Sequence, residues 1–161
     1  MKADSKINRE AGLVLKGLLY ARVLRRGEKV WKDLGLIAER CVTNAGVAFL
    51  VDRLQDGAAL NVFRYHDSGT GTAAESAADT GLGTPTGEAR DTGSLEEGVS
   101  ANIFKTKATH TYAGTFAITE HGVFSAAAIG TLWDRSKFTA INVYPGDKIE
   151  WTYLLNCIAG G

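Results

Sequence analysis

The sequence has little proline and cysteine, and it lacks a long apolar run. Of its 161 residues, two are proline and two are cysteine. Cys41 and Cys157 are too few for a disulfide scaffold in a chain of this length, so we interpret them as small buried residues of a reducing compartment. No apolar run approaches the ~20 residues that cross a bilayer, and residues 1–10 are polar. We therefore expect neither a membrane segment nor a signal peptide.

Net charge is also absent, because 18 Lys and Arg residues balance 18 Asp and Glu residues. A dedicated nucleic-acid binder usually has a basic excess, so we expect no nucleic-acid partner. The balance hides an uneven distribution. Residues 1–64 carry twelve basic and seven acidic side chains (+5), residues 65–104 one and seven (−6), and residues 105–161 five and four (+1). Either all these charges are simply solvated, or unlike surfaces of neighbouring copies pack together.

Glycine, by contrast, is frequent. The 19 glycines are irregularly spaced, and many stand beside Thr, Ser, Asn or Asp, which is typical of a β protein with many turns. Alternation of apolar and polar residues is clearest over residues 148–158, where one side of the strand is aromatic. The expected strands are residues 18–25, 30–34, 36–42, 61–66, 101–112, 115–120, 122–126, 131–140 and 148–158.

A single convincing helix follows Thr43 or Asn44, either of which can serve as its N-cap, and Gly57 is placed to end it. Its apolar stripe at i, i+3, i+4 and i+7 predicts core packing against a sheet; the stripe consists of Val47, Leu50, Val51 and Leu54. We also expect large aromatic side chains in the core, or at a subunit interface if they are exposed: Phe63, Trp133, Trp151 and Tyr153.

Two segments stand apart from this pattern. Residues 1–12 are polar and without a period, and we assign residues 1–16 to an N-terminal arm. Residues 68–98 form a long loop in which 21 of 31 residues are Gly, Ala, Ser or Thr. Such a segment buries too little to fold alone, so it is either mobile or ordered by a neighbour. The fold class is therefore mainly β, an antiparallel β-sandwich or jelly-roll-like domain over residues 17–161 with one short helix.

Motifs for catalysis or cofactor binding are weak. Gly69, Gly71 and Ala74 match the dinucleotide pattern G-x-G-x-x-G/A, and Asp91 lies twenty residues beyond Gly71. Residues 75–91, however, offer neither the helix nor the buried strand that the motif needs. The serines and cysteines lie in no recognisable nucleophile motif; the candidates are Ser68, Ser125, Cys41 and Cys157.

The histidines allow a metal site only if two strands meet. His66-Asp67 and Glu120-His121 would then supply four ligands, but adjacent strand residues point to opposite faces, so each pair offers one ligand per face. We interpret His121, which precedes Gly122 at an expected turn or bulge, as structural. We expect no catalytic residue, no metal and no cofactor.

A basic hairpin is expected near the N-terminus. Its basic residues stand beside Tyr20 and Trp31 and could contact phosphates, but Glu28 and Asp33 interrupt the patch. We favour contact with an acidic protein neighbour; the basic residues are Arg22, Arg25, Arg26 and Lys29.

Three stretches resemble small virion proteins of tailed bacteriophages: residues 43–51 (TNAGVAFLV), 65–73 (YHDSGTGTA) continuing to Thr80, and 117–125 (AITEHGVFS). Residues 132–136 (LWDRS) and the remainder of the chain to residue 161 belong to the same pattern. The resemblance covers nearly the whole chain after the arm. Related patterns occur in capsid decoration (cement) proteins and in tail or fibre-associated proteins.

The resemblance implies a non-enzymatic homo-oligomer of the virion, made in the host cytoplasm and placed on the capsid surface. Its implied partners are the major capsid protein and further copies of itself, as a dimer or trimer. The residues we expect at protein contacts are Lys6, Arg9, Arg22, Arg25, Arg26, Lys29, Thr70, Thr72, Arg90, Glu96 and Glu97.

Two alternatives remain open. One is a tail or fibre-adaptor protein, which is structural but lies on the tail. The other is a host-surface or glycan-binding module that uses Trp31 or Trp133 as a stacking platform.

Overall fold

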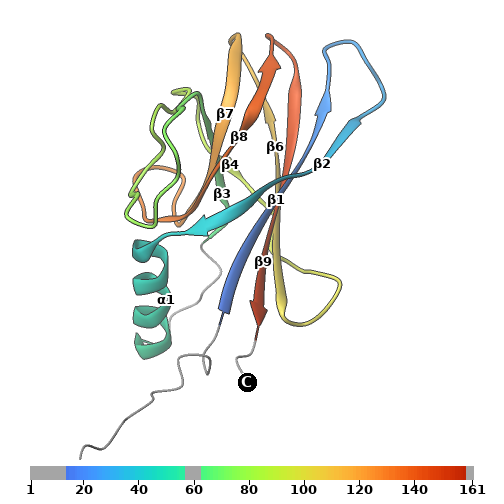
Figure 1. Ribbon diagram of the computed structural model, residues 1–161. Helices are drawn as coiled ribbons and strands as arrows, with labels where there is room; N and C mark the ends of the chain where they lie inside the picture. The colour runs from blue at the N-terminus through green and yellow to red at the C-terminus, as the bar shows by residue number, and fades with distance from the viewer. Residues whose placement is uncertain (1–13, 57–62, 159–161) are drawn as a thin grey trace, which may run out of the picture.

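The computed structural model describes residues 14–56 and 63–158, which form nine strands and one helix (Figure 1). The bounds are β1 (Val14–Leu24), β2 (Lys32–Val42), α1 (Asn44–Asp56), β3 (Tyr65–Gly69), β4 (Asp91–Thr92), β5 (Glu96–Glu97), β6 (Ile103–Thr111), β7 (Phe116–Phe124), β8 (Leu132–Val143) and β9 (Lys148–Ile158). Lys6 and Arg9 lie outside the described residues. Residues 14–16, which we assigned to the N-terminal arm, are instead the first residues of β1 and pair with β9.

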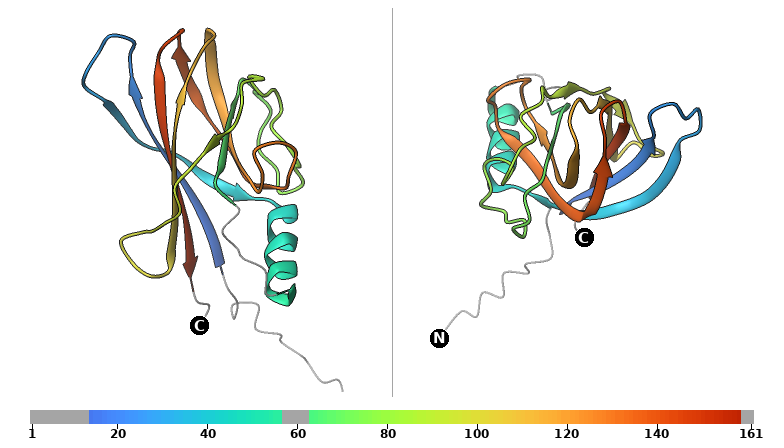
Figure 2. Two further views of the ribbon diagram at one scale, coloured as in Figure 1. Left: turned by 180° about the vertical axis from the view of Figure 1, so that it is seen from behind. Right: turned by 90° about the horizontal axis from the view of Figure 1, so that it is seen from above.

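All strand pairings are antiparallel, in the order β4-β3-β7-β8-β2-β1-β9-β6-β5. The sheet folds into two layers because β2 changes partner: most of it pairs with β1, and Cys41 and Val42 pair with β8. On the other side residues 91–97 cross between the layers, since Asp91 pairs with His66 and Glu96 with Lys105. Seen from above, the strands surround a common interior (Figure 2). The expectation of an antiparallel β-sandwich is confirmed.

The core lies between the two layers. Trp151, Tyr153 and Leu19 are fully buried from one layer, and Ile118 and Val123 from the other. Each side chain of this size stabilises the fold by about 1.5–3 kcal/mol when it is removed from water. The four aromatic residues expected in the core are all buried, with Phe63 at 5% and Trp133 at 3% exposure.

The N-terminus of α1 is capped as the sequence predicts. The Thr43 hydroxyl accepts the Gly46 N–H at 3.0 Å and donates to the Leu132 carbonyl at 2.6 Å, which fixes the helix to β8. Phe49 packs edge-on against Phe63 at 4.7 Å between ring centroids. The prediction for the apolar stripe was largely wrong, however. Leu50 packs on the core, but the other three stripe residues are exposed: Val47 at 42%, Val51 at 46% and Leu54 at 70%.

Two expected strand breaks are absent. Residues 116–124 form one strand, so His121 and Gly122 lie within β7 and not at a turn. A Cβ at Gly122 would lie 2.9 Å from Phe124 and 3.0 Å from Leu82, so the glycine makes room for packing. Likewise β2 is continuous through Gly35, which has a φ of 69° at a register shift, and Asp33 accepts the Gly35 N–H.

Candidate interaction surface

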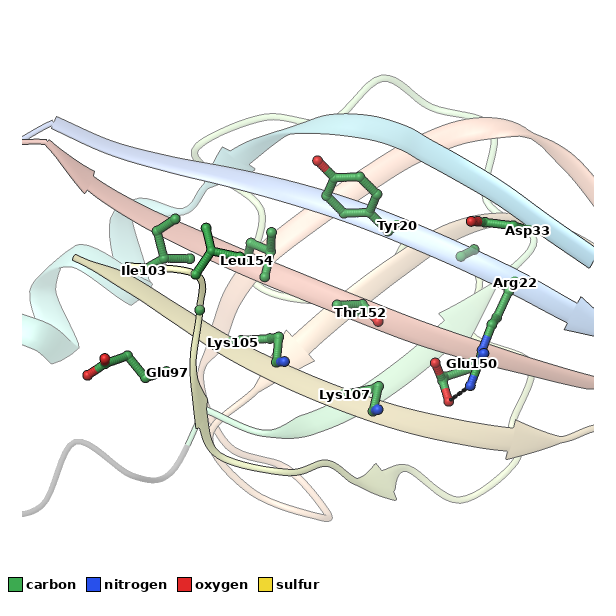
Figure 3. A pocket seen from close by; sticks show the side chains of 13 residues that line it. Tyr20, Arg22, Asp33, Glu97, Ile103, Lys105, Lys107, Glu150, Thr152 and Leu154 are labelled. Atoms are coloured by element: carbon green, nitrogen blue, oxygen red, sulfur yellow. Dashed lines mark hydrogen bonds and ion pairs between the residues drawn. The ribbon is translucent and has the colours of Figure 1, made fainter. Parts of the chain in front are cut away.

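The outer face of the β2-β1-β9-β6 layer has an apolar centre. Strand register places Leu18 beside Leu154 and Tyr20 beside Thr152, while Leu36 lies opposite Tyr20. Figure 3 shows Tyr20, Thr152 and Leu154 on the same side of the sheet, with Ile103 beside Leu154 at one end. Four of the apolar side chains are half-buried, and Leu36 is 44% exposed. We call this surface the β1–β9 face; its apolar centre is Leu18, Tyr20, Leu36, Ile103 and Leu154.

The face is hollowed by a groove of about 560 Å³. One wall is formed by the segment after β5, where the Val99 side chain is fully exposed. Two of the sequence-predicted contact residues, Arg22 and Glu97, line the groove together with Lys105 and Lys107. The groove is therefore a shallow, partly apolar surface with charges along its sides.

Ion pairs surround the apolar centre. Lys16 binds Glu39 at 3.2 Å, Arg22 binds Glu150 at 2.8 Å and Lys105 binds Glu96 at 2.5 Å. The Arg22 guanidinium also lies over the Trp31 ring, 4.7 Å from its centroid. Because the Lys16–Glu39 pair is exposed on both sides, it contributes only about 0–1 kcal/mol, and its side chains can exchange partners at little cost.

The basic hairpin is joined to the β8–β9 turn by one carboxylate. Asp147 is 3% exposed and accepts from Arg25 Nη1 at 2.7 Å, from the Arg26 N–H at 2.8 Å and from the Tyr144 N–H at 3.1 Å. Burial alone would raise the pKa of Asp147, but these donors outweigh it and lower the pKa. We call residues 25–31 with residues 144–147 the hairpin tip. It projects from the body at the end opposite α1 (Figures 1 and 2).

The hairpin tip exposes both charge and apolar surface. Arg26 and Lys29 are exposed, and Val30 and Tyr144 are 77% and 58% exposed. Arg25 differs from its neighbours because it also donates to the Asn142 carbonyl at 2.6 Å. Of the basic residues predicted in this hairpin, Arg22 and Arg25 are thus engaged within the chain, and Arg26 and Lys29 point to solvent.

The loop of residues 68–98 is ordered by its own chain. The Glu120 carboxylate, fully buried, accepts the N–H groups of Gly71, Gly83 and Thr84 at 2.7–3.0 Å. Burial alone would raise the pKa of Glu120, but these amides and Arg135 lower it. The glycines of the apparent dinucleotide motif serve this contact: a Cβ on Gly69 or Gly71 would collide with the carboxylate.

Arg135 also holds the loop in place. Its side chain, 3% exposed, binds Glu120 and Asp79 at 2.8 Å and donates to the carbonyls of Ala73 and Ala74. This loop, which has few large apolar residues, is therefore held in place by charge-assisted hydrogen bonds. The sequence-based expectation that this loop is either mobile or ordered by a neighbour was wrong, because Glu120 and Arg135, which hold it, lie far along the same chain.

The acidic segment of residues 65–104 is mostly neutralised within the fold. Asp67 binds Arg90 at 3.1 Å, and Asp79 binds Arg135. Arg90 also donates to the carbonyls of Ala126 and Ile129. Arg90 is thus directed inward. Of the other predicted loop contacts, Glu96 is paired with Lys105, Thr72 is exposed, and the Thr70 N–H binds the Thr84 carbonyl.

Two of the three histidines form a buried pair. Strands β3 and β7 do meet, and His66 Nδ1 lies 3.0 Å from His121 Nε2, while His66 Nε2 lies 3.0 Å from the Thr106 hydroxyl. The carboxylates point elsewhere, as expected for alternating strand residues. Burial lowers the pKa of His66 to about 3. Burial, with His66 nearby, also lowers the pKa of His121 well below its usual value, so both rings are neutral.

His110 has the opposite environment. Its Nδ1 lies 2.5 Å from Asp91, its Nε2 bonds to Glu88, and Glu88 also accepts the N–H groups of Ala113 and Gly114. Burial alone would lower the pKa of His110, but the two carboxylates outweigh it and raise the pKa. Protonated His110 on β6 therefore binds Asp91 of β4 and Glu88 of the loop, and Glu88 in turn binds the β6–β7 turn.

Other chemistry has little support in the described residues. No three His, Cys, Asp or Glu side chains within residues 14–56 and 63–158 are arranged to hold a metal ion. The Ser68 hydroxyl is buried and bonded to Tyr112 at 3.0 Å. Cys157 is a half-buried free thiol. Within the same residues, no helix has the length and apolar character needed to cross a membrane.

Sequence reasoning missed the apolar centre of the β1–β9 face, the contacts of Asp147 at the hairpin tip and the buried Glu120–Arg135 pair. Leu18, Tyr20 and Leu154 fall on the nominally polar side of alternating strands, and that departure from alternation was the available signal. Asp147 and the Glu120–Arg135 pair gave no local signal. Comparison with known proteins adds nothing further: no protein-family model, curated protein or solved structure matches this chain.

Proposed function

We propose that this chain is a structural protein of a tailed-phage virion, and specifically a capsid decoration protein that binds the outer surface of the shell. The resemblance of residues 43–51, 65–80 and 117–125 to virion proteins motivates the proposal. The structural observation that carries it is the hairpin tip, a projecting element fixed by a buried carboxylate and ending in unpaired basic and apolar side chains. Such a tip is suited to a protein contact.

In this account the hairpin tip contacts the major capsid protein. Arg26 and Lys29 provide charges for an acidic site, and Val30 and Tyr144 provide the apolar area that a stable contact requires. Because Asp147 already fixes Arg25 and the turn, binding orders few additional groups.

The effect on the shell is thermodynamic. A protein that binds the assembled shell but not its dissociated subunits stabilises the shell by mass action. Many weak contacts act together because neighbouring copies raise one another's effective concentration.

The positions of the reactive side chains favour a structural role over a catalytic one. His66 and His121 bond to each other in the interior, and Ser68 bonds to Tyr112. The glycan-binding alternative is weakened because Trp133 is 3% exposed and the Trp31 ring is covered by Arg22. A tail or fibre-adaptor role remains the second candidate, since the hairpin tip would serve a tail protein equally well.

Particles that lack this chain distinguish the two locations. We expect their heads to be complete but more easily ruptured, as observed by negative-stain microscopy after mild heating. Intact heads with missing tail parts would contradict the proposal and support the adaptor.

The role of the hairpin tip is tested with two charge reversals. Lys29→Glu should weaken binding to purified heads about tenfold, because a like charge then faces the acidic site. Lys137→Glu on β8, away from the hairpin tip, is the matched control and should bind normally. Equal binding by both variants would contradict a contact through the hairpin tip.

A further inference from the structure

We propose that the β1–β9 face pairs with the same face of a second copy of this chain, forming a two-fold symmetric dimer. The inference deepens the proposed function, because it identifies the surface through which a virion protein of this kind would self-associate. The dimer itself can be measured in purified protein without any particle.

The β1–β9 face has an apolar centre where solvent would be expected to meet polar side chains. The solvent side of an antiparallel layer is ordinarily polar. Here Leu18, Tyr20 and Leu154 lie on adjacent strands, with Leu36 and Ile103 beside them. An apolar centre within a charged rim is the usual composition of a protein interface.

The charged side chains around the apolar centre form a rim of mixed sign. Its cations are Lys16, Arg22, Lys105, Lys107 and Lys148, and its anions are Asp33, Glu39, Glu96, Glu97 and Glu150, so 5 − 5 gives a net charge of zero. A nearly neutral rim of mixed sign does not select a strongly acidic or basic partner, and it does not repel a copy of itself. Across a two-fold axis, each cation can meet an anion of the partner copy.

The β1–β9 face is large enough for a specific interface. Four strands span roughly 19 Å, and β1 from Lys16 to Leu24 spans roughly 26 Å, from strand spacing and rise. The footprint is therefore roughly 500 Å² per copy, or roughly 1,000 Å² for two, which reaches the lower limit for a specific interface. Two sheets pack face to face in this way in ordinary β-sandwiches.

Two other exposed surfaces fit a second copy less well. The β2 edge pairs with β8 only at Cys41 and Val42, but two register shifts against β1 distort it, which disfavours edge-to-edge strand addition. The exposed stripe of α1 is narrow, with three aliphatic side chains on one helix, at Val47, Val51 and Leu54. A residue of that stripe, Leu54, therefore provides the control substitution in the experiment below.

The test is sedimentation velocity of the purified chain over a concentration series up to about 100 µM. We expect the wild type to show a concentration-dependent dimer. Leu154→Lys should raise the dissociation constant at least about tenfold, because it places a charge in the apolar centre. Leu54→Lys on α1, the matched control, should leave the dissociation constant within about twofold. Circular dichroism checks that each variant is folded.

A second measurement does not depend on disrupting the apolar centre. Thr152→Cys places a thiol beside Tyr20 at the middle of the face, and oxidation should trap a covalent dimer that the wild type does not form. A wild type that remains monomeric at about 100 µM, or a dimer disrupted by Leu54→Lys but not by Leu154→Lys, would overturn the inference. A monomer that still decorates heads would overturn this inference alone. A dimer absent from particles would overturn the proposed function alone.

Discussion

Glu120 on β7 and Arg135 on β8 form an ion pair at 2.8 Å in the interior, with 0% and 3% of their side chains exposed. Around this pair a loop with few large apolar residues is ordered through its own backbone, since Glu120 accepts three loop amides and Arg135 donates to two loop carbonyls. The loop thus belongs to the folded domain before any partner binds.

Glu120→Gln should destabilise the chain by about 3 kcal/mol, because it removes one of the two carboxylates that pair with the buried Arg135 and weakens the acceptor for three loop N–H groups. The same substitution should accelerate hydrogen exchange at the amides of Gly71, Gly83 and Thr84. Glu97→Gln, at an exposed carboxylate, is the control and should change neither quantity. Unchanged amide protection in Glu120→Gln would show that the loop is held by something else.

The buried histidine pair should make the fold sensitive to acid. His66 and His121 have pKa values depressed by burial, so below about pH 6.5 the unfolded state binds more protons than the folded state. The free energy of unfolding should therefore fall with falling pH, by up to about 1.4 kcal/mol per pH unit for each histidine. Urea denaturation between pH 7.5 and pH 4.5 measures this slope. A His66→Gln, His121→Gln variant should have a smaller slope, and an equal slope would refute the assignment.

His110 should act in the opposite direction. Its pKa is raised in the folded state, so its stabilisation is complete below about pH 6.5 and is lost as the pH rises through the folded pKa. His110→Asn should then cost about 2 kcal/mol at pH 6, where the charge-assisted bonds to Glu88 and Asp91 are intact, and much less at pH 9. Unfolding free energies at the two pH values give the comparison. The same cost at both would mean that the histidine is not charged.

Gly46→Ala should destabilise the chain by about 1–3 kcal/mol although alanine favours helices. A Cβ at residue 46 would lie 2.9 Å from the Trp133 carbonyl oxygen and 3.0 Å from its Cα, and backbone atoms cannot easily move aside. Gly81→Ala, where a Cβ would meet nothing within 4 Å, is the matched control. Thermal unfolding that ranks the two variants equally would contradict the close approach of α1 and β8.

Much of the fold follows from local alternation. The pattern of residues 148–158 predicts β9 with its observed bounds, and the aromatic side of that strand forms the core. Thr43 was identifiable as an N-cap because capping depends on neighbouring residues alone. The prediction of a strand break at Gly122 was wrong because a glycine that makes room for packing cannot be distinguished, from the local sequence, from one that makes a turn.

The interaction surfaces were less predictable for a physical reason. Periodicity shows that α1 has an apolar stripe, but it does not show whether the same chain covers it, and here most of the stripe is exposed. The loop depends on Glu120 and Arg135, which lie 36 and 56 residues from the Thr84 and Asp79 that they bind. Leu154 joins Tyr20 only through the pairing of β9 with β1. Contacts this distant in sequence are not encoded in any local pattern.

Quantitative mass spectrometry of separated heads and tails tests the central claim most directly, using particles produced from the genome that encodes this chain. The account predicts that the chain co-purifies with heads in many copies, in a fixed ratio to the major capsid protein. Its recovery with tails, or its absence from both fractions, would contradict a capsid decoration protein.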